Sequence, residues 1–461
     1  MNLNKQILKQ HAGIILALVL MLMSCQRNTG YGQLIGVQDR NRAIPPIPHG
    51  MVYIPSGHFI MGAGGDDPSY SMNNTPRTVS ISAFYMDETE ITNNQYRQFV
   101  NWVIDSLKFR LLGEVDPAFL IEDPNDEYGG LPAINWRHRP RRWTPEMLEA
   151  IEQLYTPIEE RYYRRREIDT RKLNFEFQTF DYRAAAQRSE GEIDSRYDGI
   201  HMASFATRPQ SLRSRAGYIR RHVVNVYPDT LCWIVDFSYS YNDPMVRSYF
   251  SSPMYDHYPV VGVNWHQARA FAKWRTIMHN NDLTRRGFAE LNEYRLPTEA
   301  EWEFAARGGL ELNPYPWGGP YAMNMNGCLI GNFKPQRGKY ALDGGLYPVI
   351  VGHYAPNDYG LYDMMGNVAE WCIDMFTESN EMAHDFNPVV EYDAKSDDPM
   401  AKKRKVIRGG SFKDFAELCK VYHRHYEYQD TAKSYIGFRC VMSYLGRDRN
   451  DNMRTASNVH R

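Results

Sequence analysis

The stretch at residues 295–303 reads Arg-Leu-Pro-Thr-Glu-Ala-Glu-Trp-Glu. Within it, Thr298 and Glu301 have the spacing of a capping box, in which each side chain bonds a free backbone N–H at the start of a helix. Gly308 and Gly309 follow at the distance of a helix end, because glycine takes the left-handed conformation readily. The stretch therefore predicts a short helix that is closed at both ends.

Two further helices are predicted upstream, each by a polar cap followed by apolar residues at helical spacing. Thr92 caps the first and Asn264 caps the second. The residues expected on their buried faces are Tyr96, Phe99, Val100, Val103 and Leu107 in the first, and Ala268, Phe271, Ala272 and Trp274 in the second.

The predicted strands lie mainly near the start of the domain. Residues 51–62 (MVYIPSGHFIMG) contain two apolar runs around Pro55-Ser56-Gly57, which predicts a β-hairpin. Residues 77–87 alternate apolar and polar side chains, as a half-buried strand does. From 309 to about 442 the chain is rich in Gly, Asn, Asp and aromatic residues, which predicts loops and short strands.

Eight sequence phrases together resemble one known family. They are, in chain order, residues 51–62, Glu90-Ile91-Thr92-Asn93 with Tyr96 and Phe99, 258–265 (YPVVGVNW), 295–303, 359–363 (YGLYD), 366–371 (GNVAEW), 408–412 (RGGSF) and 436–440 (IGFRC). In this order they are similar to the formylglycine-generating-enzyme, or sulfatase-modifying factor, family. The resemblance implies a single α+β domain at 50–442, related to C-type lectins and low in regular secondary structure.

Between about 111 and 255 the chain changes to long charged segments rich in Arg and Tyr, such as 161–166 (RYYRRR). The resemblance makes this block an insertion in the domain. Thr144-Pro145-Glu146 starts a helix there, with an apolar side expected at Met147, Leu148, Ile151, Leu154 and Tyr155. Arg and Tyr are enriched where proteins dock, which favours a partner surface. Interleaved acidic residues leave a simply solvated insertion as the alternative.

The resemblance also implies two structural calcium sites. One ion would be held by the side chains of Asp363 and Glu370 and by the backbone carbonyls of Gly366 and Val368. Hard oxygen ligands of this kind suit Ca²⁺. The other site would use Asp343, Gly345 and a ligand near Asn326. The alternative for both sets is that these residues only form turns.

Catalytic members of the family use two cysteines that bind copper, and this chain matches only one of them. Asp414 stands at the first cysteine position and Cys419 at the second. A single thiolate beside a carboxylate is a poor site for a soft metal ion. We therefore expect no copper, no catalysis and a buried structural role for Cys419. His423 and His425 are also expected to be structural.

The N-terminus has the order of a secretory signal at residues 1–24, with Lys5 and Lys9 before an apolar run. Leu22-Met23-Ser24-Cys25 is similar to a lipobox, so we expect Cys25 to carry a lipid; an ordinary secretory signal is the alternative. Residues 25–49 form a polar tether and 443–461 a polar tail. Five further cysteines without a Cys-x-x-Cys pair predict at least one free thiol.

The composition limits the partners. A formal net charge of −2 gives no reason to expect nucleic acid, and 43% hydrophobic residues suffice for a large core. The lipobox, the altered cysteine pair and the insertion together resemble lipoproteins of the gliding-motility and type IX secretion machinery. That resemblance implies attachment to the periplasmic face of the outer membrane, self-association in a ring and a GldN/PorN-type partner. The alternatives are an oxidising enzyme of cysteine or small molecules, a lectin-like ligand-binding protein and a GldJ-like gliding lipoprotein.

Overall fold

The structure, a computed structural model, describes residues 47–64, 74–121, 132–140, 142–180, 218–237, 243–288, 290–335, 341, 343–378 and 384–445. Cys25, the expected signal segment and the tail beyond 445 lie outside these residues. No helix in the described ranges is both long enough and apolar enough to cross a bilayer.

The structure contains two four-stranded sheets, and strands from both ends of the described chain meet in the first of them. One has the order β1-β4-β14-β9 and is antiparallel throughout. The other has the order β12-β11-β10-β13, in which β10 and β13 run parallel. Their bounds are Met51–Ile54 (β1), Phe84–Asp87 (β4), Val441–Ser443 (β14), Tyr294–Arg295 (β9), His425–Tyr428 (β12), Arg404–Arg408 (β11), Ala369–Met375 (β10) and Ile436–Gly437 (β13). Distant segments thus close one α+β body.

The remaining elements surround these sheets. Three two-stranded pairs are β2 (Gly57–Met61) with β3 (Arg77–Ile81), β5 (Leu120–Ile121) with β6 (Ala133–Ile134), and β7 (Asn174–Phe180) with β8 (Ile219–Asn225). The α-helices are α2 (Asn93–Val115), α3 (Pro145–Glu152), α6 (Cys232–Asp236), α7 (Pro244–Ser248), α8 (Trp265–Arg285) and α9 (Glu299–Arg307). The short 3-10 turns are Pro117–Phe119, Ile158–Glu160, Tyr162–Arg164, Thr170–Lys172, Pro253–Tyr255, Met400–Lys403 and Ala416–Cys419.

The predicted helix starts are confirmed. Thr92, Asn264 and Thr298 each form a complete capping box with the residue three positions on. Gly308 closes α9 in the left-handed conformation with φ of 61°. Helix caps could be predicted because they depend on residues three or four positions apart.

The predicted hairpin at residues 51–62 is wrong. Both strands exist, but β1 pairs with β4 and β2 pairs with β3, so the chain passes from one sheet to another between them. A two-residue hairpin loop needs positive φ in its central residues. Pro55 fixes φ near −65° and Ser56 does not take a positive φ, so this connection cannot close a hairpin.

The single strand predicted at 77–87 is in fact two. β3 ends at Ile81 and β4 begins at Phe84, and the two strands belong to different sheets. Burial alternates in β3, as expected, but all four residues of β4 are buried, so the expected alternation is wrong there. Ser82 and Ala83 carry no signal that marks the change of sheet.

The inserted block contains more regular structure than its charged sequence suggested. α3 begins at the predicted cap Thr144 and packs against α2, with Met147 buried between them. Leu148, predicted on the buried side of α3, is 54% exposed instead. The β7–β8 hairpin was not predicted; it lies against α8, and Phe175 and Phe177 enter the main core.

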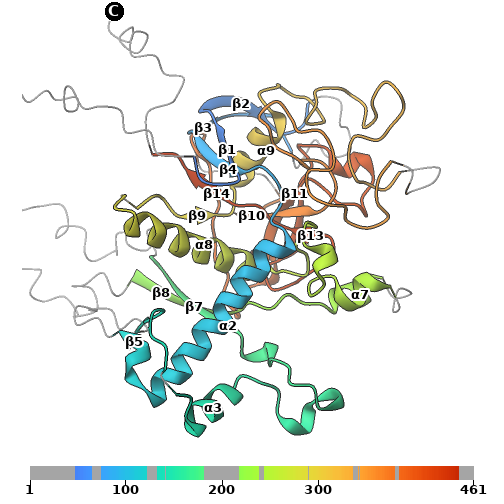
Figure 1. The fold of residues 1–461 in the computed structure, drawn as a ribbon. Coiled ribbons are helices and arrows are strands. Elements are labelled where there is room, and N and C mark those ends of the chain that lie inside the picture. Colours follow the sequence, from blue (N-terminus) through green and yellow to red (C-terminus); the bar gives the residue numbers. More distant parts are fainter. Residues whose placement is uncertain are drawn as a thin grey trace, which may run out of the picture. The chain divides into compact units, whose positions relative to one another are not determined.

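The core joins the helices to both sheets. Tyr96 of α2 stacks on Phe271 of α8, with ring centroids 5.6 Å apart and planes 14° apart. In Figure 1, α2 runs from the part of the body that holds the sheets to the part that holds α3 and β5. The segment that contains α3 and β5 is therefore attached to the core by a helix that belongs to the core itself.

All residues of α9 are buried, including its four charged ones. The carboxylate of Glu303 contacts Arg307 at 2.6 Å and Arg408 of β11 at 2.8 Å, and it also accepts the N–H of Gly62 at 2.8 Å. This one side chain thus connects α9 to a sheet strand and to the end of β2.

Glu299 lies one helical turn before Glu303 in α9 and extends the same network. Burial alone would raise the pKa of Glu299, but Arg424 and Arg408 outweigh it and lower that pKa. Glu301 pairs with Arg295 at 2.6 Å. Each buried carboxylate of α9 therefore has at least one guanidinium partner, as a charge in a low-dielectric interior requires.

We predict that Glu303→Ala destabilises the protein by about 3–5 kcal/mol, because it leaves the buried Arg307 without a carboxylate and removes one of the two carboxylates that contact Arg408. Chemical denaturation measures the change in the free energy of unfolding. The matched control is Glu378→Ala, which removes a 78% exposed carboxylate from its pair with Arg404 and should change little. Equal, small effects of the two variants would contradict the role given to the network.

Candidate functional site

The loop at 363–370 holds the residues of the first expected calcium site. Asp363 and Asn367 both have positive φ, 54° and 59°, so the loop turns sharply at these positions. The Gly352 N–H bonds Asp363 Oδ2 at 2.6 Å. The other oxygen, Oδ1, is buried and has no hydrogen-bond partner. A buried carboxylate oxygen without a partner is unfavourable unless something else, such as a cation, contacts it.

Glu370, at the end of this loop, is bound by side chains from two other elements. Arg439 makes a two-pronged ion pair with it, at 2.6 Å to Oε1 and 2.7 Å to Oε2. The indole N–H of Trp302 donates to Oε2 at 2.7 Å. A carboxylate offers about four lone-pair sites, so three bonds leave Glu370 one site at Oε1.

Glu90 is a third buried carboxylate beside Asp363 and Glu370. It belongs to one of the eight sequence phrases, but the sequence did not predict it as a site residue. It accepts from Asn367 Nδ2 at 2.8 Å and from the Val368 N–H at 3.2 Å. Burial, and then the charges of Asp363 and Glu370, raise the pKa of Glu90 well above its ordinary value. Arg439 in the phrase 436–440 was missed in the same way.

The electrostatics of this acidic cluster, Glu90, Asp363 and Glu370, favour a cation. Arg439 contributes one positive charge against three carboxylates, so the cluster carries an excess of negative charge when ionised. Burial raises the pKa of Asp363 to about 6. The free carboxylate oxygen of Asp363 is a hard ligand of the kind Ca²⁺ takes, and a bound ion would neutralise the excess charge and stiffen the loop.

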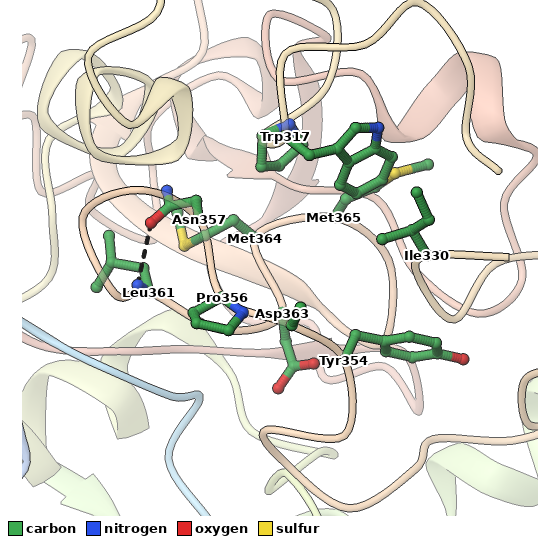
Figure 2. A pocket seen from close by; sticks show the side chains of 11 residues that line it. Trp317, Ile330, Tyr354, Pro356, Asn357, Leu361, Asp363, Met364 and Met365 are labelled. Carbon is green, nitrogen blue, oxygen red and sulfur yellow. Dashed lines mark hydrogen bonds between the residues drawn. The ribbon is translucent and has the colours of Figure 1, made fainter. Parts of the chain in front are cut away.

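Figure 2 shows a small cavity beside Asp363, with a volume of about 50 Å³. The carboxylate of Asp363 lies on the Tyr354 side of the cavity, away from Trp317. A cavity of this volume holds ordered water, which Ca²⁺ accepts as part of its shell. No group of three or more His, Cys, Asp or Glu side chains in the described residues has metal-site spacing, so a cation here would depend on the carbonyls of Gly366 and Val368.

The second expected set is brought together only in part. Asp343 Oδ2 accepts the Leu329 N–H at 3.3 Å, and the Gly345 N–H donates to Asn332 Oδ1 at 3.0 Å. Asn326 is exposed in a turn, where its N–H donates to Asn324 Oδ1 at 2.9 Å. The neighbours of Asp343 and Gly345 are therefore Leu329 and Asn332, and Asn326 contacts its own turn.

The candidate catalytic position holds an unreactive thiol. Cys419 is fully buried, and a Cβ added to Gly410 would lie only 2.5 Å from its Sγ, so the backbone packs tightly over it. Burial, and then the charge of Asp414, raise the pKa of Cys419 well above its ordinary value. Asp414 accepts from Ser411 Oγ at 2.6 Å and Ser411 N at 2.9 Å, so it acts as a turn cap. A protonated thiol is a weak nucleophile and a weak metal ligand.

The other expected residues show no reactive arrangement in the described part of the chain. The rings of His423 and His425 lie 4.1 Å apart, and burial is the main cause that lowers the pKa of both. Cys232, Cys372, Cys419 and Cys440 are buried free thiols, and Cys328 is an exposed one. The expectation of at least one free thiol is confirmed.

Comparison with known proteins identifies the family. The model of the family described as "Sulfatase-modifying factor enzyme 1-like domain" matches residues 40–157 and 235–444. The unmatched residues 158–234 fall within the block expected as an insertion, but the family model matches both ends of that block, 111–157 and 235–255.

Two curated relatives illustrate the similarity. "Inactive C-alpha-formylglycine-generating enzyme 2" of Mus musculus is 36% identical over 42% of this chain and 51% of its own length. "Formylglycine-generating enzyme" of Thermomonospora curvata is 34% identical over 41% of this chain and 57% of its own length. The chain thus spans about half the length of the curated relatives it matches.

A solved structure, "Structure of PvdO from Pseudomonas aeruginosa", aligns with 86% of this chain and 94% of its own, at 15% identity and a TM-score of 0.43.

We predict that calcium raises the melting temperature of the protein, and that Asp363→Ala removes this response because it deletes the free carboxylate oxygen. Thermal unfolding with excess calcium and with a chelator measures the shift. Asp397→Ala, at an exposed acidic residue, is the control and should keep the response. A calcium response of equal size in Asp363→Ala would show that the ion binds elsewhere.

We also predict that the free energy of unfolding decreases at acidic pH because of the buried side chain of His423. Burial, and then His425, lower its pKa to about 3, against about 6.5 in an unfolded chain. Between these values only the unfolded chain binds the proton, so the free energy of unfolding falls as the pH drops below about 6.5, by up to about 1.4 kcal/mol per pH unit. In urea titrations at several pH values, His423→Gln should flatten this slope. An unchanged slope would contradict the assignment.

Proposed function

The chain belongs to the sulfatase-modifying factor enzyme 1-like family, and from that membership we propose that it is a non-catalytic member which serves as an assembly component. The observation that carries this proposal is the pair formed by Asp414 and Cys419. A carboxylate committed to Ser411 and a buried, protonated thiol offer neither a nucleophile nor a soft metal site. The curated relative from Mus musculus, whose name reads "Inactive", supports the same interpretation.

We propose further that the protein is an outer-membrane lipoprotein of the GldK/PorK type, held on the periplasmic face by a lipid on Cys25. In this role it would form a ring in the gliding-motility and type IX secretion machinery and bind a GldN/PorN-type partner. The lipobox, the altered cysteine pair and the insertion support this proposal; a GldJ-like lipoprotein is the alternative with the same anchor and fold.

The insertion offers a suitable docking surface, which we call the Tyr–Arg tip (residues 162–165). Tyr162 and Tyr163 are 73% and 81% exposed, with ring centroids 4.4 Å apart. Exposed tyrosine and arginine are the residue types that contribute most binding energy at protein interfaces. In the described part of the chain, no carboxylate pairs with Arg164 or Arg165, so the tip fits a partner surface that carries carboxylates.

The backbone of the tip is strained. Tyr163 and Arg164 have φ of 48° and 57°, in the left-handed region that costs a side chain about 1–2 kcal/mol per residue. Strain of this kind is typical of binding sites, where it holds side chains in one arrangement. The conformation therefore presents both rings and both guanidinium groups to solvent at a cost in stability.

We predict that a tip variant with Tyr162→Ser, Tyr163→Gly, Arg164→Gly and Arg165→Ser loses partner binding but stays folded. Glycine takes a positive φ without steric cost, so its melting temperature should equal or exceed that of the wild type. Co-expression with the GldN/PorN-type protein, followed by size-exclusion chromatography, measures binding.

A matched control changes an apolar residue and an arginine on another surface. Arg286→Ser with Phe288→Ser serves this purpose at the end of α8, where Phe288 is 61% exposed. Binding should persist in this control. Full binding by the tip variant would exclude the tip as the docking surface.

A further inference from the structure

A second cavity, with a volume of about 390 Å³, lies on the face that carries Phe412 and Lys413. Ligand pockets in proteins usually have volumes of about 300–1,000 Å³. Four separate chain segments line this cavity, and they contribute Phe237, Phe333, Lys334, Gly345, Leu346, Phe412 and Lys413. Cys419 and Asp414 do not line it, but the cavity borders this position, because Lys413 precedes Asp414 and the Lys334 N–H donates to the Asp414 carbonyl at 2.8 Å.

The walls of the cavity are largely aromatic. Phe333 and Phe412 are buried in the core, and the ring of Phe237 stacks on that of Phe412 with a 16° angle between the planes. Leu346 is 59% exposed at the rim. An apolar body of phenyl size can therefore bury its surface here, with the hydrophobic effect as the driving force.

Two lysines add positive charge to these apolar walls. Lys413 Nζ lies 5.2 Å from the ring centroid of Phe237 and 4.4 Å from that of Tyr435. Lys334 Nζ lies 5.0 Å from the ring centroid of Phe415. Aromatic rings hold an ammonium group in place without neutralising its charge.

Neither ammonium group has an anionic partner in the described ranges. The ion pairs found there include none for Lys334 or Lys413, although other lysines, such as Lys273, pair with nearby carboxylates. The neighbouring carboxylate of Asp414 is bonded to Ser411. Two unpaired lysines and three phenylalanines line this one cavity, which makes it complementary to one kind of ligand, an anion joined to an apolar body.

We propose that this cavity binds a carboxylate carried on an aromatic or aliphatic body, with Lys334 and Lys413 as the anion ligands and the three phenylalanines as the apolar floor. The shared chemistry is that of an apolar amino acid with a free carboxyl group, either as a small molecule or as the last residue of a polypeptide. This binding does not depend on the assembly role, because the Tyr–Arg tip contributes no residue to the cavity.

The probe is N-acetylphenylalanine, compared with its neutral amide, in isothermal titration of the full-length protein. The acid should bind at least tenfold more tightly than the amide. Lys413→Met and Lys334→Met should each weaken binding of the acid at least tenfold while leaving binding of the amide unchanged. Lys395→Met, at an exposed lysine outside the cavity, is the control and should bind the acid as the wild type does. Equal melting temperatures establish that all variants are folded.

Three results would overturn the proposal: no binding of the acid at millimolar concentration, equal binding of acid and amide, or wild-type affinity in both lysine variants. A tripeptide that ends in phenylalanine separates the two sources of the ligand. Tighter binding than the single residue supports a polypeptide end, and equal binding supports a small molecule. Failure of the docking prediction at the Tyr–Arg tip would leave all these results unaffected.

Discussion

Pairing between buried carboxylates and guanidinium groups is the constraint on which this structure depends. α9 has only nine residues, yet Glu299 and Glu303 contact arginines that lie more than 100 residues further on, in β11 and the following loop. Most of the chain around them is loop, where few backbone hydrogen bonds repeat and the position of each segment must be set by side chains. Breaking one buried pair leaves a charge without compensation, so the network acts against any other arrangement of these loops.

The parts of the fold that could be predicted are those that depend on neighbouring residues. The caps at Thr92, Asn264 and Thr298 follow from spacings of three residues. Pro55 was a local sign against pairing of β1 with β2, but the pairing of β1 with β4 could not be predicted, because no local spacing links these two strands. Likewise, the β7–β8 hairpin bridges residues on both sides of a long charged segment, and its apolar side chains Phe175 and Phe177 give too short a pattern to identify it.

The candidate site also has a part that could be predicted from neighbouring residues and a part that could not. Asp363 and Glu370 lie in one motif and could be named from sequence, but Glu90 and Arg439 reach the same place from distant segments. Glu90 was visible only as an acid beside the cap of α2, which is usually a solvent-exposed position. The expectation that Asp414 stands at a family cysteine position comes from the sequence phrases alone, whereas the burial of Cys419 depends on the close approach of Gly410 and on the surrounding core. The proposal of a non-catalytic role therefore rests on the sequence at Asp414 and on the burial of Cys419 in the structure.

The central claim is that a family fold without its copper-binding thiols serves assembly. Native mass spectrometry of the protein, purified from its own membrane in mild detergent, tests this most directly, since one spectrum reports both bound metal and bound chains. The account predicts a complex with a second polypeptide in fixed stoichiometry and no copper. A single chain that carries one copper ion would contradict it and would restore Cys419 as a catalytic residue.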